Sequence, residues 1–282
     1  MTCELEVNER RIRHPRRGIA VVVATAIARR FPNVTAYVRT MALFVAFWWA
    51  LARWTANPAL LPSPFAVVEA IIELVADGEI FMHAGISLGR MLLSLGLASL
   101  LAIPLGLAMG LRRTLDELVD PVVELLRPIS GIAWIPLALF MFGIGNVLPV
   151  FIMTYAAFFP ILLGTIAGVR SVDRRLIDVA RTMGVARRTI VARVVVPAAL
   201  PALLVAVRLG VASSWTAVVA AELIGAPSGV GYAVEWYREL LMTPQVMAFI
   251  ATIGVLGYLT DRTLRALAQR FTPWATQLEG VR

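Results

Sequence analysis

The sequence contains no lysine, and all 26 of its basic residues are arginine. A phosphate-binding loop of the Gly-x4-Gly-Lys-Ser/Thr type needs a lysine, so the chain cannot carry that nucleotide site. Cys3 is the only cysteine, and His14 and His83 are the only histidines. A single cysteine excludes an intramolecular disulfide and a cysteine-based metal cluster. We therefore expect no cofactor, metal or catalytic site in the chain itself.

Charged side chains are also scarce. They make up 16% of the chain, whereas hydrophobic residues make up 59% and the mean hydropathy is +0.80. Soluble domains typically contain about a quarter charged and about half apolar residues. The composition therefore predicts an all-α, polytopic integral membrane protein.

The charge balance is nevertheless strongly basic, with a net charge of +8 and a pI near 10.8. Such a balance occurs in nucleic-acid-binding proteins, but basic cytoplasmic loops of a membrane protein explain it more simply. The Arg-rich residues 10–17 contain no interleaved aromatic side chain, which argues against binding of single-stranded nucleic acid. A membrane-anchored binder of nucleic acid or anionic lipid is the weaker hypothesis, and we expect no nucleic-acid partner.

Several uncharged stretches approach the length of about 20 residues that a membrane-crossing helix needs. Residues 91–111 and 240–260 are two clear examples. The uncharged run 128–169 is too long for one crossing and contains a Gly- and Pro-containing turn at 143–149, so it predicts a hairpin of two spans. We predict six spans, at about residues 40–52, 91–111, 119–141, 147–169, 198–224 and 240–260.

The arginines are distributed unevenly among the loops that connect these spans. If the N-terminus is cytoplasmic, 21 of the 26 arginines lie on that side, as the positive-inside rule requires. We therefore expect a multi-pass protein of the bacterial cytoplasmic membrane with both termini inside.

The N-terminal region contains an apolar run, residues 18–28, that resembles the core of a signal peptide. Cleavage after it would leave arginines leading a translocated end, against the charge distribution. We interpret residues 1–36 as a cytoplasmic Arg-rich segment with a short interfacial helix, residues 37–270 as the membrane domain and residues 271–282 as a cytoplasmic tail.

The longest internal cytoplasmic loop, residues 170–197, has an amphipathic pattern. Apolar residues recur on one face of an expected helix at Val172, Leu176, Val179, Ala180 and Met183. Gly184 is placed to end that helix in a left-handed conformation. A second helix can follow from about Ala186, and Pro197 marks the entry to the fifth span. Taken alone, a basic amphipathic helix most often lies on the bilayer surface.

The spacing in this loop resembles the cytoplasmic signature of the permease subunits of binding-protein-dependent ABC importers. That signature begins Glu-Ala-Ala, has a glycine after three more residues, and ends with an aliphatic pair and a proline thirteen positions beyond the glycine. The matching residues of this chain follow without insertion: Asp178, Val179, Ala180, Gly184, Val194, Val196 and Pro197. Aspartate replaces glutamate and valine replaces alanine. Asp178 keeps the carboxylate but is one methylene shorter, which affects the expected ion pair more than the docking role.

The resemblance covers roughly residues 60–270. Four stretches in order are similar to the nitrate, sulfonate and taurine branch of these permeases: LLPSPFAVVEAI, LRPISGIAWIPLALFMFGIGN, SSWTAVVAAELIGAPSGVGY and YLTDRTLRAL. The resemblance implies a type I ABC importer permease fold and a small anionic or zwitterionic solute.

The resemblance also implies partners. These are a second permease subunit, expected to be an identical copy, two cytoplasmic ATPases that bind ATP and Mg²⁺, and an extracytoplasmic substrate-binding protein. The loop helix is expected to sit in a groove of the ATPase. There Ala180 lets backbones approach, Gly184 makes the turn, and the charges of Asp178 and Arg181 pair across the contact. The residues expected to couple transport to ATP are Asp178, Ala180, Arg181, Gly184 and Pro197.

Polar residues inside the predicted spans are the other candidates, because ionisable groups there are costly and usually face a cavity or partner. By analogy with the family, the fifth span lines the translocation path, which makes Ser213, Ser214, Trp215 and Glu222 path candidates. For each serine the simpler interpretation is a bond to a backbone carbonyl or close helix packing. Arg127 and Arg208 could attract an anion. Each could equally snorkel or pair with an acid such as Glu124.

A secondary carrier that works without an ATPase is the alternative from another class. Such carriers typically show an inverted repeat with broken helices at matching places, and no such repeat is visible in this sequence.

Overall fold

The computed structural model describes residues 32–55 and 57–273, and these residues form helices without any strand. The residues up to Ala56 and those from Asn57 onward form two compact units, which we describe separately. The first unit contributes one described helix, α2 (Pro32–Thr55). The predicted interfacial helix at 18–28 and most of the C-terminal tail lie outside the described residues.

The second unit contains the remaining elements. In chain order they are α3 (Pro64–Ala76), α4 (Glu79–Leu111), α5 (Arg113–Leu126), the 3-10 turn η1 (Gly131–Trp134), α6 (Ile135–Phe142), α7 (Val147–Arg170), α8 (Arg174–Thr182), α9 (Arg187–Ile190), the π turn η2 (Val191–Val195), α10 (Val196–Gly225), α11 (Val230–Glu239) and α12 (Thr243–Phe271).

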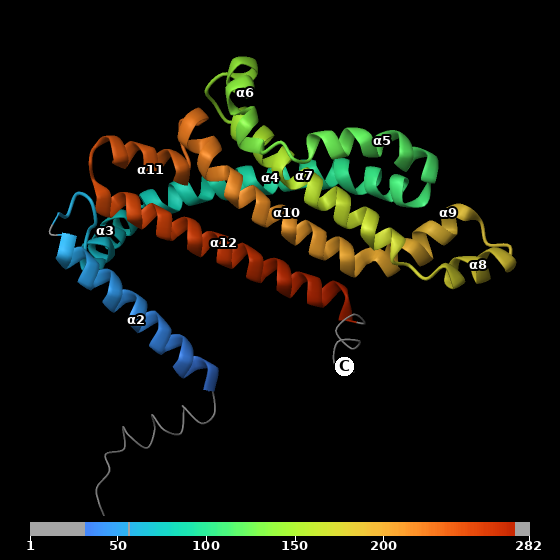
Figure 1. Cartoon of the computed structure of the whole chain (residues 1–282), viewed down its shortest axis with the longest axis horizontal. Coiled ribbons are helices and arrows are strands. Elements are labelled where there is room, and N and C mark those ends of the chain that lie inside the picture. The colour runs from blue at the N-terminus through green and yellow to red at the C-terminus, as the bar shows by residue number, and fades with distance from the viewer. Residues whose placement is uncertain (1–31, 56, 274–282) are drawn as a thin grey trace, which may run out of the picture. The chain divides into compact units, whose positions relative to one another are not determined.

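The centre of this unit is the packing of α7 along both α4 and α10, as Figure 1 shows. Glycines make the close approach possible. A Cβ added at Gly164 would lie 2.3 Å from the Ala206 Cβ, and one added at Gly106 would lie 2.8 Å from the Thr165 Cβ. Small residues at helix contacts are the usual way in which membrane helices bring their backbones together. The close contact between α7 and α10 therefore requires glycine at Gly164, where a larger residue would not fit.

A second layer forms around α12, which packs against α11, α10 and α3. Phe249 of α12 is fully buried, in a cluster with Leu74 of α3 and Val230 of α11. Ser63 caps the N-terminus of α3, because its hydroxyl accepts a hydrogen bond from the Ala66 amide at 3.3 Å. This cluster lies at the end of the unit opposite to α8 and α9 (Figure 1).

Four helical stretches are long and apolar enough to cross a bilayer: residues 79–111, 147–170, 187–225 and 243–271. They contain or largely contain four of the six predicted spans, which are thereby confirmed as helices. The predicted first span, 40–52, lies within α2, which is not among these four. It has only 13 uncharged residues between Arg39 and Arg53, so its crossing of the membrane stays a prediction.

The prediction of one span at 119–141 is wrong as a straight helix. α5 and the η1–α6 segment meet at an angle of 79°, with the break at residues 127–130. Pro128 lacks a backbone N–H, so it cannot continue the hydrogen-bond ladder of α5. The hydropathy of the uncharged run did not predict this break, because a bent helix is as apolar as a straight one.

Gly164 offers a direct test of this packing. Replacing Gly164 with valine places a branched side chain against the Ala206 backbone, so we expect a loss of about 1–3 kcal/mol of stability. Thermal denaturation of the detergent-solubilised chain, followed by fluorescence-detected size exclusion, measures it. Gly96→Val is the matched control, since an added Cβ there meets nothing within 4 Å. Equal melting of the two variants would contradict the proposed role of close α7–α10 packing.

Candidate functional site

The loop between α7 and α10 folds as the sequence predicts, into a helix, a turn and a second helix. Asp173 caps α8, because its Oδ1 accepts a hydrogen bond from the Arg175 amide at 2.9 Å. Gly184 follows with φ of +74°, in the left-handed region. An added Cβ at Gly184 meets no atom within 4 Å, so its backbone conformation alone favours glycine there. Ala186 then precedes α9.

The apolar face of α8 is uncovered in the single chain. Leu176, Val179 and Met183 are 54%, 59% and 76% exposed. Val172, by contrast, is buried in a cluster with Val169 of α7 and Val195, which fixes the start of the loop to the helices. Three large apolar side chains on one exposed helix face are typical of a contact surface for another molecule.

The charged residues of this helix lie on its surface. Asp178 and Arg181 are both about two-thirds exposed, and their side chains approach each other to 3.4 Å. An exposed pair at three-residue spacing contributes little to stability. Both charges therefore remain free to exchange partners when another protein binds. In the single chain they pair with each other, and pairing across a contact stays a prediction.

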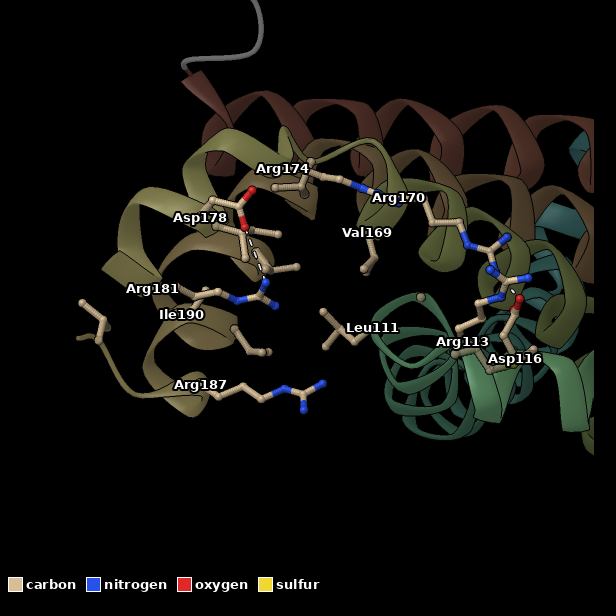
Figure 2. A pocket seen from close by; sticks show the side chains of 17 residues that line it. Leu111, Arg113, Asp116, Val169, Arg170, Arg174, Asp178, Arg181, Arg187 and Ile190 are labelled. Atoms are coloured by element: carbon tan, nitrogen blue, oxygen red, sulfur yellow. Dashed lines mark hydrogen bonds and ion pairs between the residues drawn. The ribbon is translucent and has the colours of Figure 1, made fainter. Parts of the chain in front are cut away.

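A large basic cavity lies beside this loop. It has a volume of about 880 Å³, and Figure 2 shows it between the α8–α9 segment and the start of α5. Arg181 and Arg187 extend toward this space. Arg170, at the end of α7, pairs with Asp116 of α5 at 2.5 Å. The charged residues that line the cavity are Arg113, Asp116, Arg170, Arg174, Asp178, Arg181 and Arg187. The loop surface therefore combines an apolar helix face with a positively charged recess.

Pro197 lies in the first turn of α10. The segment before it, η2, is a π turn that continues from α9 without a break. Residues 187–225 consequently form one continuous stretch from the loop into the membrane domain.

Glu222 is fully buried at the other end of α10. Its Oε1 accepts a hydrogen bond from Arg90 of α4 at 2.7 Å, and the Ser87 hydroxyl lies 2.8 Å from both carboxylate oxygens. The amide of Gly231 donates to Oε2 at 3.0 Å. Arg90 is itself 5% exposed. A buried carboxylate with this many partners is fixed, so Glu222 joins two spans in the described structure.

Arg90, the partner of Glu222, also forms hydrogen bonds with two other segments of the chain. Its guanidinium donates to Asn146, before α7, at 2.5 Å and to the Ser228 carbonyl at 2.6 Å. Gly229 adopts φ of +109°, and an added Cβ there would lie 2.4 Å from the Glu222 carboxylate. The loop between α10 and α11 is therefore folded closely around the ion pair.

Next to this loop, Tyr237 of α11 donates its hydroxyl to Glu79 at 2.6 Å. Burial, reinforced by this hydrogen bond, raises the pKa of Tyr237 to about 12, so the hydroxyl keeps its proton at neutral pH.

The three path candidates near the middle of α10 have different surroundings. Ser214 is buried and its hydroxyl donates to the Met153 carbonyl at 3.3 Å. Trp215 is 8% exposed and its indole donates to Thr260 at 2.9 Å. Ser213 is partly exposed and lines a second cavity, of about 430 Å³, together with Arg127. Ser213 therefore lines a cavity, whereas the Ser214 and Trp215 side chains are buried in helix contacts.

Arg208 forms ion pairs with Asp261 of α12, which also binds Arg265. The charge of Arg208 is therefore paired within the chain. Arg127 has no such partner among the described residues, and Glu124 does not pair with it.

Arg90 is a functional residue that the sequence did not predict, because it directly precedes the uncharged stretch 91–111 and resembles the charged end of a span. α4 begins at Glu79, so Arg90 lies well inside the helix. A signal was present, because His83, Ser87, Arg90 and Ser94 recur at four- and three-residue spacing on one helix face. All four are buried.

The chain is similar in sequence to known transport proteins. A family model described as "binding-protein-dependent transport system inner membrane component" matches residues 102–273. The chain is 36% identical over 253 residues to the taurine transport system permease protein TauC of Escherichia coli (strain K12), covering 88% of this chain and 92% of the relative. It is 33% identical over 240 residues to the putative aliphatic sulfonates transport permease protein SsuC of Bacillus subtilis (strain 168), covering 85% and 87%.

A solved structure shows the same fold. An inward-facing conformation of the MetNI methionine ABC transporter matches with a TM-score of 0.53 and 20% identity, over 64% of this chain and 92% of that chain. At this level of identity the match describes the fold alone.

The buried ion pair makes a prediction about stability. Glu222→Gln leaves Arg90 buried without a counter-charge, and breaking a buried pair in this way costs about 3–5 kcal/mol. We expect a large drop in the melting temperature of the purified chain. The double variant Arg90→Met, Glu222→Leu removes both charges and should recover part of the loss.

The control for this experiment is Glu117→Gln, because Glu117 pairs with Arg113 at a solvent-exposed site. That change should leave the melting temperature unaltered. If Glu222→Gln melted like the control, the ion pair would not hold the spans together.

Proposed function

This chain belongs to the family of inner membrane components of binding-protein-dependent transport systems, and on that premise we propose how it works in an ATP-driven importer. It is a transport component and not an enzyme. We assign it the membrane permease subunit that forms the path for a small anionic or zwitterionic solute of the sulfonate, taurine or bicarbonate type.

The observation that carries the proposal is the uncovered apolar face of α8, held between the ends of the two best-packed membrane helices. Leu176, Val179 and Met183 would dock into a groove of a cytoplasmic ATPase. Burying such side chains is favourable by about 1.5–3 kcal/mol each. Since these residues are 54–76% exposed in the single chain, the contact would gain the corresponding part of this energy.

The named residues take separate roles in this contact. Ala180 allows close approach of the ATPase backbone, and Gly184 makes the sharp turn between α8 and α9. Asp178 and Arg181 exchange their mutual ion pair for partners on the ATPase. Pro197 begins α10, which carries the displacement of the loop into the membrane.

The rest of the assembly follows from the family. We propose a second copy of this chain, two ATPases that bind ATP and Mg²⁺, and an extracytoplasmic binding protein that delivers the solute. The bias of arginines toward one side supports a bacterial cytoplasmic membrane location with the α8 loop and both termini inside. The path residues would come from the middle of α10, with Ser213 open to it and Ser214 and Trp215 positioning the helix. Glu222 would hold the external end.

Gly184 gives the first test of coupling. Gly184→Val forces a branched residue into a left-handed conformation, which costs about 1–3 kcal/mol locally. We expect the variant to insert into the membrane at normal levels but to abolish ATP-dependent uptake of radiolabelled taurine or alkanesulfonate in cells that express the complete importer. Asp178→Arg should behave in the same way, because it replaces the negative member of the pair.

The matched control is Gly254→Val, since Gly254 lies in α12 with open space around an added Cβ. It should retain uptake. Wild-type import by Gly184→Val would contradict the coupling role. Uptake by the lone chain without any ATPase would instead support the secondary carrier.

The apolar face of α8 makes a separate prediction about assembly. Val179→Asp puts a charge into the centre of the proposed contact, where burying an unpaired carboxylate is strongly unfavourable. We expect the co-purifying ATPase to be lost, measured as the ratio of the two proteins after affinity capture of the permease in detergent. Leu118→Asp is the control, because Leu118 is an exposed apolar residue of α5 outside the loop. Unchanged capture with Val179→Asp would place the ATPase contact elsewhere.

A further inference from the structure

Glu222, Arg208 and Arg127 are ionisable residues of the predicted spans, and the structure explains two of them. Glu222 is paired with Arg90, and Arg208 is paired with Asp261. Arg127 is different. Within residues 32–55 and 57–273, no carboxylate lies within ion-pair distance of its guanidinium, and no hydrogen bond from it is present.

Arg127 lies level with the middle of α7. The preceding residue, Leu126, is fixed to α7, because its carbonyl accepts a hydrogen bond from the Tyr155 hydroxyl at 2.8 Å. At about 1.5 Å of rise per residue, Tyr155 lies about 22 Å from the Arg170 end of α7 and about 12 Å from the Val147 end. Arg127 is exposed in the single chain. An arginine at this level of a membrane-spanning helix requires water or a counter-charge from outside the chain.

The surroundings of Arg127 form a site for such a counter-charge. The cavity of about 430 Å³ is lined by the break at residues 127–132, by α7 and by the middle of α10. This volume is within the range of small-molecule sites, about 300–1,000 Å³. None of its lining residues is acidic. The cavity therefore carries one full positive charge and no negative one.

Two hydroxyls complete the set of donors. Ser130 and Ser213 both line the cavity, and neither side chain has a hydrogen-bond partner among the described residues. Thr216 lines it too, but its hydroxyl already donates to backbone carbonyls of its own helix. Aromatic and aliphatic side chains, among them Tyr155 and Phe159, form the walls. A few convergent polar groups in a mainly apolar cavity are typical of a ligand site.

The break in the helix is what brings these donors together. Arg127 ends α5 and Ser130 precedes η1, so the 79° bend places both at the corner. Irregular backbone is tolerated at membrane depth only where it is buried in protein or lines a water-filled cavity. Broken helices also line the substrate sites of many secondary transporters.

We propose that this cavity is an anion site within the membrane, in which Arg127 binds the charged oxygens of the solute and the Ser130 and Ser213 hydroxyls donate to them. The site rests on the proposed function, since it names the place where a transported sulfonate or similar organic anion pauses. A guanidinium suits such a group because it can donate two parallel hydrogen bonds to a planar or tetrahedral oxyanion.

The acidic residues of α5 stay outside the cavity. Asp116, Asp120 and Glu124 follow one another at four-residue spacing, which puts them on one face of α5. None of them lines the cavity, and Asp116 pairs with Arg170 at the end of α7.

Cysteine modification tests the site directly, because Cys3 is the only cysteine to remove. In a Cys3→Ser background, Ser213→Cys is exposed in membrane vesicles to three methanethiosulfonates: the anionic sulfonatoethyl, the cationic trimethylammonioethyl and the neutral methyl reagent. We expect the anionic reagent to be favoured over the cationic one. Arg127→Gln should lower that rate ratio about tenfold, as loss of one charge-assisted contact of about 1.4 kcal/mol implies. Ethanesulfonate should protect Ser213→Cys, and Arg127→Gln should abolish the protection.

The controls separate charge from folding. Arg127→Lys should restore most of the rate ratio. Arg112→Gln removes an exposed arginine at the other end of α5, outside the cavity, and should leave the ratio unchanged. Equal modification by the neutral reagent in all variants shows that the cavity has kept its shape. The proposal is overturned if Arg127→Gln leaves the rate ratio unaltered, or if ethanesulfonate does not protect Ser213→Cys.

This measurement needs neither an ATPase nor import. An anion-selective cavity in a chain that fails the coupling tests would retain the site and refute the importer mechanism. Coupled import by a chain whose cavity shows no anion preference would support the importer mechanism and refute the anion site.

Discussion

The buried pair of Arg90 and Glu222 is the interaction on which the membrane domain depends. A charge inside a membrane protein must be paired, and here one pair satisfies that need while joining segments far apart in the sequence. Arg90 also binds Asn146 and Ser228, and Ser87 supplies both a donor to the carboxylate and an acceptor for the Val230 amide. α4, α7, α10 and the start of α11 are thereby fixed at one end. Loss of either charge would leave the other buried and uncompensated.

The opposite end is where the proposed partner would act. α8 and α9 connect α7 to α10, and the glycines of α7 let these two helices pack with their backbones close together. The helices are thus tied firmly at the Glu222 end and accessible to a partner at the α8 end. Between the two ends lie the break at residues 127–130 and its cavity.

The sequence predicted most of the elements and the function, but not the contacts between them. Periodicity and glycine placement identified α8, the turn at Gly184 and α9, because these features are local. Hydropathy located α4, α7 and α10 but could not detect the bend at Pro128, since a bent run is as apolar as a straight one.

Ion pairs between residues far apart in the chain could not be predicted from the sequence. Glu222 was recognised as unusual, yet its partner Arg90 is 132 residues away, and a single sequence does not indicate which acid meets which base. The polar face of His83, Ser87, Arg90 and Ser94 on α4 was the only available signal. Its four-and-three spacing predicts one helix face but not the helix that covers it.

The arginines outside the basic cytoplasmic segments show how membrane energetics can rank candidate sites. Arg90, Arg208 and Arg238 each have a carboxylate partner in the chain, and Arg53 lies over the ring of Trp49 at 5.2 Å. Each of these cations therefore has a partner within the fold, and the exposed pair of Arg238 is the weakest of them. Arg127 has no such partner among the described residues, and its cavity contains free hydroxyls and no acid. In the site proposed above, the counter-charge of Arg127 comes from solution.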